Sequence, residues 1–107
     1  SLQGAVMSRI DQLDPVAKLI LKYATVMGDN IDTKVLAHLL RNNTSNELFK
    51  KNFESLIEYG YLERKADIHK FNNSLVAESI YKSLLRTQRK ELSVEIEKAN
   101  NDVYKKP

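Results

Sequence analysis

Apolar residues recur at intervals of three and four positions along most of this 107-residue chain, and this spacing restricts its fold most strongly. A first helix is predicted over 2–13, with an apolar face made of Leu2, Val6, Ile10 and Leu13. Asp14 and Pro15 begin a second helix, because Asp14 can cap free N–H groups and Pro15 lacks an N–H that would need a partner. This helix ends at Gly28, and its apolar stripe consists of Val16, Leu19, Ile20, Tyr23 and Met27.

Two further helices follow. Asp32 is expected to cap a short helix whose apolar residues are Val35, Leu36, Leu39 and Leu40. Thr44 and Glu47 have the spacing of a capping box, which predicts another helix over about 45–59. Its apolar face consists of Phe49, Phe53, Leu56 and Ile57. Gly60 ends this helix.

Residues 61–72 are predicted to form a two-stranded hairpin. If Ala66 and Asp67 form its turn, Leu62 faces Phe71 as an apolar pair, and these two side chains anchor the hairpin. On the other face, the same register places Glu63 opposite Lys70 as an ion pair. Ala-Asp is not a favoured two-residue turn, so a longer loop remains an alternative.

The last predicted helix covers 74–100 and is capped by Ser74. Its main apolar stripe consists of Tyr81, Leu85, Gln88, Leu92 and Ile96, and Ile80 and Leu84 widen this stripe. The same pattern also allows this helix to be interrupted near Thr87.

The order of these elements predicts a mainly α, winged-helix-like fold. Three core helices lead directly into a two-stranded hairpin wing, and helices at the N- and C-terminal ends flank this unit. The length fits a single domain over 1–107. Because the chain begins at Ser1 rather than Met, we expect it to be a fragment of a larger multidomain protein, with Ser1 and Leu2 as a candidate cloning scar.

Composition and motifs argue against catalysis. The chain has no Cys, which excludes disulfides and thiolate metal sites, and no acidic residue stands at ligand spacing from His38 or His69. Glycines at 4, 28 and 60 cannot form a phosphate-binding loop. We therefore expect no enzyme activity, no catalytic or metal-binding residues and no cofactor. Neither a membrane span nor a signal peptide is recognisable, so we expect a cytoplasmic protein without a membrane partner.

DNA binding is the first alternative function, because winged helices often bind DNA. The 17 basic and 14 acidic residues give a formal charge of +3, which is only mildly basic. The helix that would enter the major groove carries two Lys and three Glu between 46 and 58. Arg64, Lys65 and Lys70 on the wing are the candidate phosphate contacts. A protein–protein interaction module is a further alternative.

Three segments resemble the AAA+/STAND signalling proteins. Residues 2–14 are similar to the run that closes the ATPase module in that family, of the form L-x-x-x-x-x-x-R-[IL]-D-x-L. Residues 16–28 resemble the small, apolar helix that follows this run. Residues 71–81 resemble the family pattern F-x-H-x-L-V-x-E-x-x-Y. Soluble adenylyl cyclases and multidomain bacterial regulators have this arrangement.

The resemblance implies a non-catalytic regulatory winged-helix module directly after the ATPase module of an adenylyl-cyclase-like protein. Its partners would be that ATPase module and C-terminal helical repeats of the same chain, to which it would pass the nucleotide state. Asn73 stands where related proteins have a phosphate-sensing histidine, and Asn can donate a hydrogen bond but supplies no charge. Arg9 and Asp11 are candidate contacts with the ATPase module.

Overall fold

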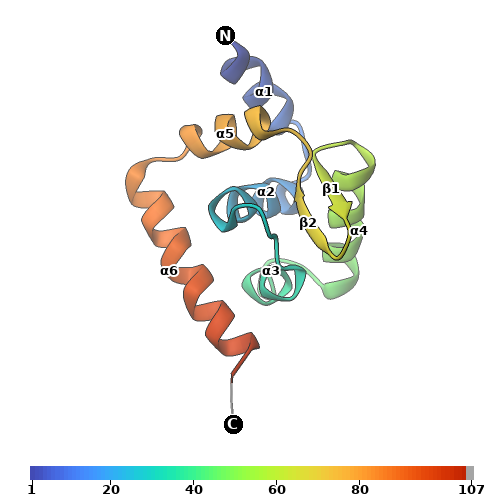
Figure 1. Ribbon diagram of the computed structural model, residues 1–107, viewed down its shortest axis with the longest axis vertical. Helices are drawn as coiled ribbons and strands as arrows, with labels where there is room; N and C mark the ends of the chain where they lie inside the picture. Colours follow the sequence, from blue (N-terminus) through green and yellow to red (C-terminus); the bar gives the residue numbers. More distant parts are fainter. Residues whose placement is uncertain (106–107) are drawn as a thin grey trace.

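The computed structural model describes residues 1–105, which contain six helices and one antiparallel hairpin (Figure 1). In chain order the elements are α1 (Leu2–Ile10), α2 (Pro15–Met27), α3 (Thr33–Leu39), α4 (Asn46–Glu58), β1 (Leu62–Lys65), β2 (Ile68–Phe71), α5 (Ser74–Ser83) and α6 (Arg86–Val103). The predicted mainly helical fold with one small hairpin is therefore confirmed. Within residues 1–105, no helix is both long enough and apolar enough to cross a membrane.

The boundaries of α2 and α3 follow from the caps predicted for them. The Asp14 carboxylate accepts a hydrogen bond from the backbone N–H of Val16 at 2.9 Å, and Gly28 ends α2 with a φ of 90° that favours glycine. The Asp32 carboxylate caps α3 by accepting from the N–H groups of Lys34 and Val35. These local signals therefore predicted both helices correctly, whereas α1 ends at Ile10, earlier than expected.

The cap of α4 differs from the prediction by one residue. Ser45, not Thr44, accepts the hydrogen bond from the N–H of Leu48, at 3.1 Å. The backbone N–H of Thr44 instead donates to the carbonyl of Leu40, so Thr44 still belongs to the turn that follows α3. This local turn leaves Ser45 as the cap and places the start of α4 at Asn46.

The hairpin has the predicted register. Leu62 pairs with Phe71 and Glu63 with Lys70, and the two residues between the strands form the turn, so the longer loop is wrong. Ala66 takes a φ of 55°, the positive value that such a tight turn requires. Leu62 is 1% exposed, but Phe71 is only partly buried. Leu62 is therefore the deeper of the two expected anchors.

The last predicted helix is two helices in the structure. Leu84 and Leu85 have extended backbone, and α6 begins at Arg86 after the Gln88 side chain accepts a hydrogen bond from the N–H of Leu85. The break moves half of the predicted stripe out of the core, so that Leu85 is 67% exposed while Leu84 is buried. Asn73, not Ser74, caps α5.

The core is built around α2, which lies between α5, α6 and α4 in the centre of the molecule (Figure 1). Ile20, Leu21 and Ala24 of this helix have no exposed surface. The other most deeply buried large side chains come from all around α2 and are Ile31, Val35, Leu36, Leu40, Leu56, Leu62 and Ile80. The predicted stripe on α2 was too narrow, because Ala17, Leu21 and Ala24 are buried as well.

Candidate functional site

Two helices from opposite ends of the chain meet on one side of the molecule. Helix α1 packs against α5, and α2 packs against α5 from below (Figure 1). The Thr25 hydroxyl, near the end of α2, donates a hydrogen bond to the backbone carbonyl of Ala77 in α5 at 2.9 Å. The structure thus brings the segment 71–81 against the segments 2–14 and 16–28, which lie more than 40 residues before it in the sequence.

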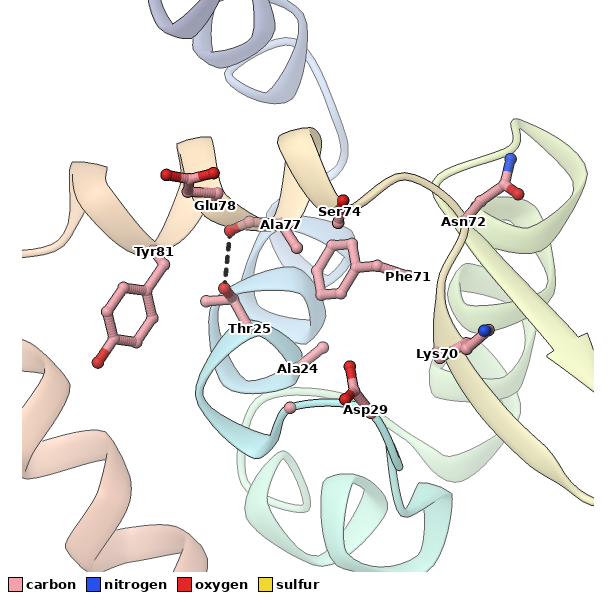
Figure 2. A pocket seen from close by; sticks show the side chains of 11 residues that line it. Ala24, Thr25, Asp29, Lys70, Phe71, Asn72, Ser74, Ala77, Glu78 and Tyr81 are labelled. Atoms are coloured by element: carbon pink, nitrogen blue, oxygen red, sulfur yellow. Dashed lines mark hydrogen bonds between the residues drawn. The ribbon is translucent and has the colours of Figure 1, made fainter.

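A pocket of about 440 Å³ opens where α2 ends and α5 begins (Figure 2). Its lining residues come from α2, β2 and α5 and from the adjoining loops, and they are Ala24, Thr25, Gly28, Asp29, Lys70, Phe71, Asn72, Ser74, Ala77, Glu78 and Tyr81. Figure 2 shows the Phe71 ring directed into the space between α2 and α5, with the Thr25–Ala77 hydrogen bond beside it. We call this cavity the α2–α5 pocket.

Two of the three charged side chains that line the α2–α5 pocket, Lys70 and Glu78, form ion pairs, and the third is Asp29. Lys70 lies 3.8 Å from Glu63, its predicted cross-strand partner, and Glu78 lies 2.7 Å from Lys82 one turn later in α5. The Arg89 guanidinium lies 4.3 Å from the centre of the Tyr81 ring, which is a cation–π contact. The first pair lies within the hairpin, the second lies within α5, and the cation–π contact joins α6 to α5.

Asn73 lies beside this pocket but has a structural task. Its side-chain oxygen accepts a hydrogen bond from the N–H of Leu75 at 2.8 Å and so caps α5. Its amide N–H groups can donate to a ligand, but they carry no formal charge. The residue expected to sense phosphate is thus the cap of a helix, with its side-chain oxygen held by the backbone.

Arg9 and Asp11 lie at the exposed end of α1. Within the described part of the chain, neither side chain forms an ion pair or a side-chain hydrogen bond. The Asp11 backbone carbonyl accepts a long hydrogen bond from Lys18, but its carboxylate remains in solvent. Both side chains can therefore contact another protein surface without losing an internal partner.

Two of the three candidate phosphate contacts on the hairpin are already paired. Arg64 lies 3.2 Å from Glu54 of α4, and its Nε donates to the His69 ring at 3.0 Å. Lys70 is paired with Glu63, as described above, whereas Lys65 extends into solvent with no ion pair among residues 1–105. Carboxylates thus neutralise most of the positive charge that the sequence places on the hairpin.

The two histidines do not form a metal site. The His38 ring lies 3.2 Å from the Asp102 carboxylate in α6, a partner that the sequence did not reveal because it follows 64 residues later. His69 packs edge-on against Phe53 with the ring centres 5.1 Å apart. Among residues 1–105, no group of three or more His, Cys, Asp or Glu side chains is arranged to hold a metal ion.

Three polar links join helix α6 and the residue that follows it to the rest of the molecule. The Tyr23 hydroxyl donates to Glu95 and the Tyr104 hydroxyl to Asp32, each at 2.5 Å, and His38 contacts Asp102. Burial, together with the hydrogen bond to Glu95, raises the pKa of Tyr23. The hydrogen bond to Asp32 likewise raises the pKa of Tyr104. In α6 itself Ala99 is buried, and Leu92 and Ile96 are partly buried against the core, so apolar packing adds to these polar links.

We expect His69 to weaken the fold in mild acid. Burial against Phe53 and the nearby Arg64 charge lower the pKa of His69 below its ordinary 6.5. As the pH falls through 6.5, the unfolded chain therefore takes up this proton before the folded chain does, and the free energy of unfolding decreases. Urea unfolding between about pH 7.5 and about pH 5.5 should show this slope, and His69→Gln should reduce it. An NMR titration of the His69 ring with a midpoint at or above 6.5 would contradict the prediction.

Comparison with known protein families, with curated proteins and with solved structures gives no match for this chain.

Proposed function

We propose that this chain is a winged-helix module that regulates a STAND-type signalling ATPase of the adenylyl-cyclase-like kind, in the cytoplasm, without catalysing a reaction itself. One observation carries the proposal: the segment 71–81, more than 40 residues away in the sequence, packs against both of the N-terminal segments that resemble the STAND pattern. Segments that share one function are expected to lie in contact, and α5 contacts both α1 and α2 here.

In this proposal α1 follows the ATPase module and turns Arg9 and Asp11 towards it. Their exposure and their lack of internal partners support this role. A shift of α1 would be felt directly by α5, against which it packs, and α5 continues through the extended Leu84–Leu85 joint into α6.

Helix α6 is suited to pass such a shift towards C-terminal helical repeats. It has 18 residues and spans about 27 Å. Ala99 is the one fully buried residue of α6, with Leu92 and Ile96 partly buried, whereas α2 has five buried residues. A change in the position of α6 therefore costs less than a change in the position of α2. The three polar links to Tyr23, His38 and Asp32 define its resting position.

Hydrogen–deuterium exchange of the full parent chain, with and without ATP, tests this proposal. We expect nucleotide to change exchange rates in α1 and α5 by about fivefold or more. The double variant Arg9→Ala/Asp11→Ala should remove most of this change, and Lys22→Ala, an exposed residue of α2, is the matched control. A parent chain without a glycine-rich phosphate-binding loop, or an ATP response that spares α1 and α5, would overturn the proposal.

Against the DNA-binding alternative, we expect this domain to bind duplex DNA only weakly and without sequence preference. Arg64 and Lys70 are paired with carboxylates, so the hairpin can neutralise at most about three phosphates. Affinity should then fall roughly 40-fold between about 50 and about 200 mM salt. Fluorescence anisotropy with two labelled duplexes, of which one has the scrambled sequence of the other, measures the affinity, its salt dependence and any sequence preference. Sub-micromolar binding to one duplex and not to the other would favour DNA recognition instead.

A further inference from the structure

A second groove, separate from the α2–α5 pocket, lies between α3, α4 and the hairpin. It encloses about 490 Å³ and is lined in part by three aromatic rings, those of Phe49, Phe53 and His69. The rings pack on one another, with Phe49 and Phe53 centres 6.1 Å apart and His69 edge-on to Phe53. Figure 1 shows the three elements that form it, with α4 behind the hairpin and α3 below. We call this cavity the aromatic groove.

Positive side chains from three different elements line the aromatic groove. Lys34 comes from α3, Lys50 from α4 and Arg64 from β1, and all three are exposed. The one carboxylate in the lining is that of Glu54, which is already paired with Arg64 at 3.2 Å. Lys34 and Lys50 make no ion pair within residues 1–105, so their charges are available to a ligand.

We propose that the aromatic groove binds an acidic segment of a partner protein that inserts an apolar side chain between the two lysines. Charge complementarity selects this occupant, because an apolar floor bordered by unpaired cations matches an apolar anchor flanked by carboxylates. A volume of about 490 Å³ accommodates such an anchor, and most of the lining residues stand on the helices α3 and α4, so the site needs little ordering on binding. This inference does not depend on the regulatory function proposed above.

A nucleic acid fits the aromatic groove less well. A duplex gains affinity from cations that follow its phosphate backbone, and an apolar floor gives it no partner for those phosphates. The Glu54 carboxylate would moreover face the backbone at the same place. Among the charged side chains of α4, two Lys stand against three Glu, which disfavours a duplex along that helix.

The test uses a fluorescein-labelled peptide of sequence ELEEFLEE and fluorescence anisotropy on the whole chain. We expect a dissociation constant in the range of about 1–100 µM at roughly 0.1 M salt, rising by about tenfold at roughly 0.5 M salt. Two comparison peptides separate the contribution of charge from that of the apolar anchor. KLKKFLKK reverses the charge, and ESEESSEE removes the apolar anchor. Each should bind at least about tenfold more weakly than the first peptide.

Charge-reversal variants then locate the binding site. Lys34→Glu and Lys50→Glu should each weaken binding of ELEEFLEE by about tenfold. Lys51→Glu is the matched control, since Lys51 is the exposed neighbour of Lys50 on α4 but does not line the groove, and it should change binding by less than about threefold. Circular dichroism of each variant verifies that the exposed substitutions leave the fold intact.

Three outcomes would overturn this proposal. One is no binding of ELEEFLEE below about 1 mM, and another is equal weakening by Lys50→Glu and Lys51→Glu. A third is duplex DNA that binds more tightly than the peptide and loses its affinity in Lys50→Glu, which would assign the groove to nucleic acid.

Discussion

Leu62→Ala is expected to lower the free energy of unfolding by about 2–5 kcal/mol, among the largest effects of any single truncation in this chain. Leu62 is 1% exposed and joins the first strand of the hairpin to the core formed with α4. Removing its side chain leaves a cavity that the short hairpin cannot close, because its two strands are held in one register by the turn at Ala66. Urea denaturation followed by circular dichroism measures the change.

Two variants of the same hairpin serve as comparisons. Phe71→Ala should cost about 2 kcal/mol, less than a fully buried phenylalanine would, because the Phe71 ring is only partly buried beside the α2–α5 pocket. Lys65→Ala, at an exposed position of β1, should change stability by less than about 0.5 kcal/mol. A Leu62→Ala cost as small as that of Lys65→Ala would contradict the packing described here.

The second large expected effect is a difference in stability loss between truncations of two adjacent leucines. Leu84→Ala is expected to destabilise the fold by about 2–4 kcal/mol, whereas Leu85→Ala should change it by less than about 0.5 kcal/mol. Leu84 is 5% exposed and Leu85 is 67% exposed, because the backbone between α5 and α6 is extended at both residues. The same urea assay on the two single variants measures the difference.

The comparison of these leucines also tests where the helix breaks. In an uninterrupted helix over 74–100, Leu85 would lie on the apolar stripe with Tyr81 and Leu92 and would be as costly to truncate as Leu84. Equal losses from both variants would therefore contradict the break at Leu84–Leu85. A decrease in the free energy of unfolding for Leu84→Ala but not for Leu85→Ala agrees with two separate helices.

Several local features were predictable from the sequence because the interactions that create them lie within a few residues. Asp14 and Asp32 cap the helices that follow them, and Gly28 supplies the positive φ at the end of α2. The register of Leu62 with Phe71 follows from strand alternation, since a shift of one strand by one residue would put these two apolar side chains on opposite faces.

The helix break and the attachment of α6 depended on tertiary structure. Ile80 and Leu84 form one helical stripe, and Tyr81 and Leu85 form another. No glycine or proline nearby indicates which of the two stripes is buried or where the helix ends. In the structure Ile80 and Leu84 are the buried pair. The chain turns after them, so that α6 packs along α2 and α3. The links from Tyr23 to Glu95 and from Asp32 to Tyr104 join residues 72 positions apart, a separation at which sequence spacing carries no signal.

For the candidate sites, too, some features follow from the sequence and others only from the tertiary structure. The sequence alone determined the caps of α2 and α3 and the hairpin register, and it gave Arg9, Asp11, Asn73 and the hairpin cations only as expected contact residues. Only the tertiary structure decided that Asn73 is used as a helix cap, that Glu54 neutralises Arg64, and that Lys34 and Lys50 border one groove. The physical reason is that local hydrogen bonding and side-chain periodicity act within one or two turns, whereas charge pairing and concave surfaces arise between elements that only the packed core brings together.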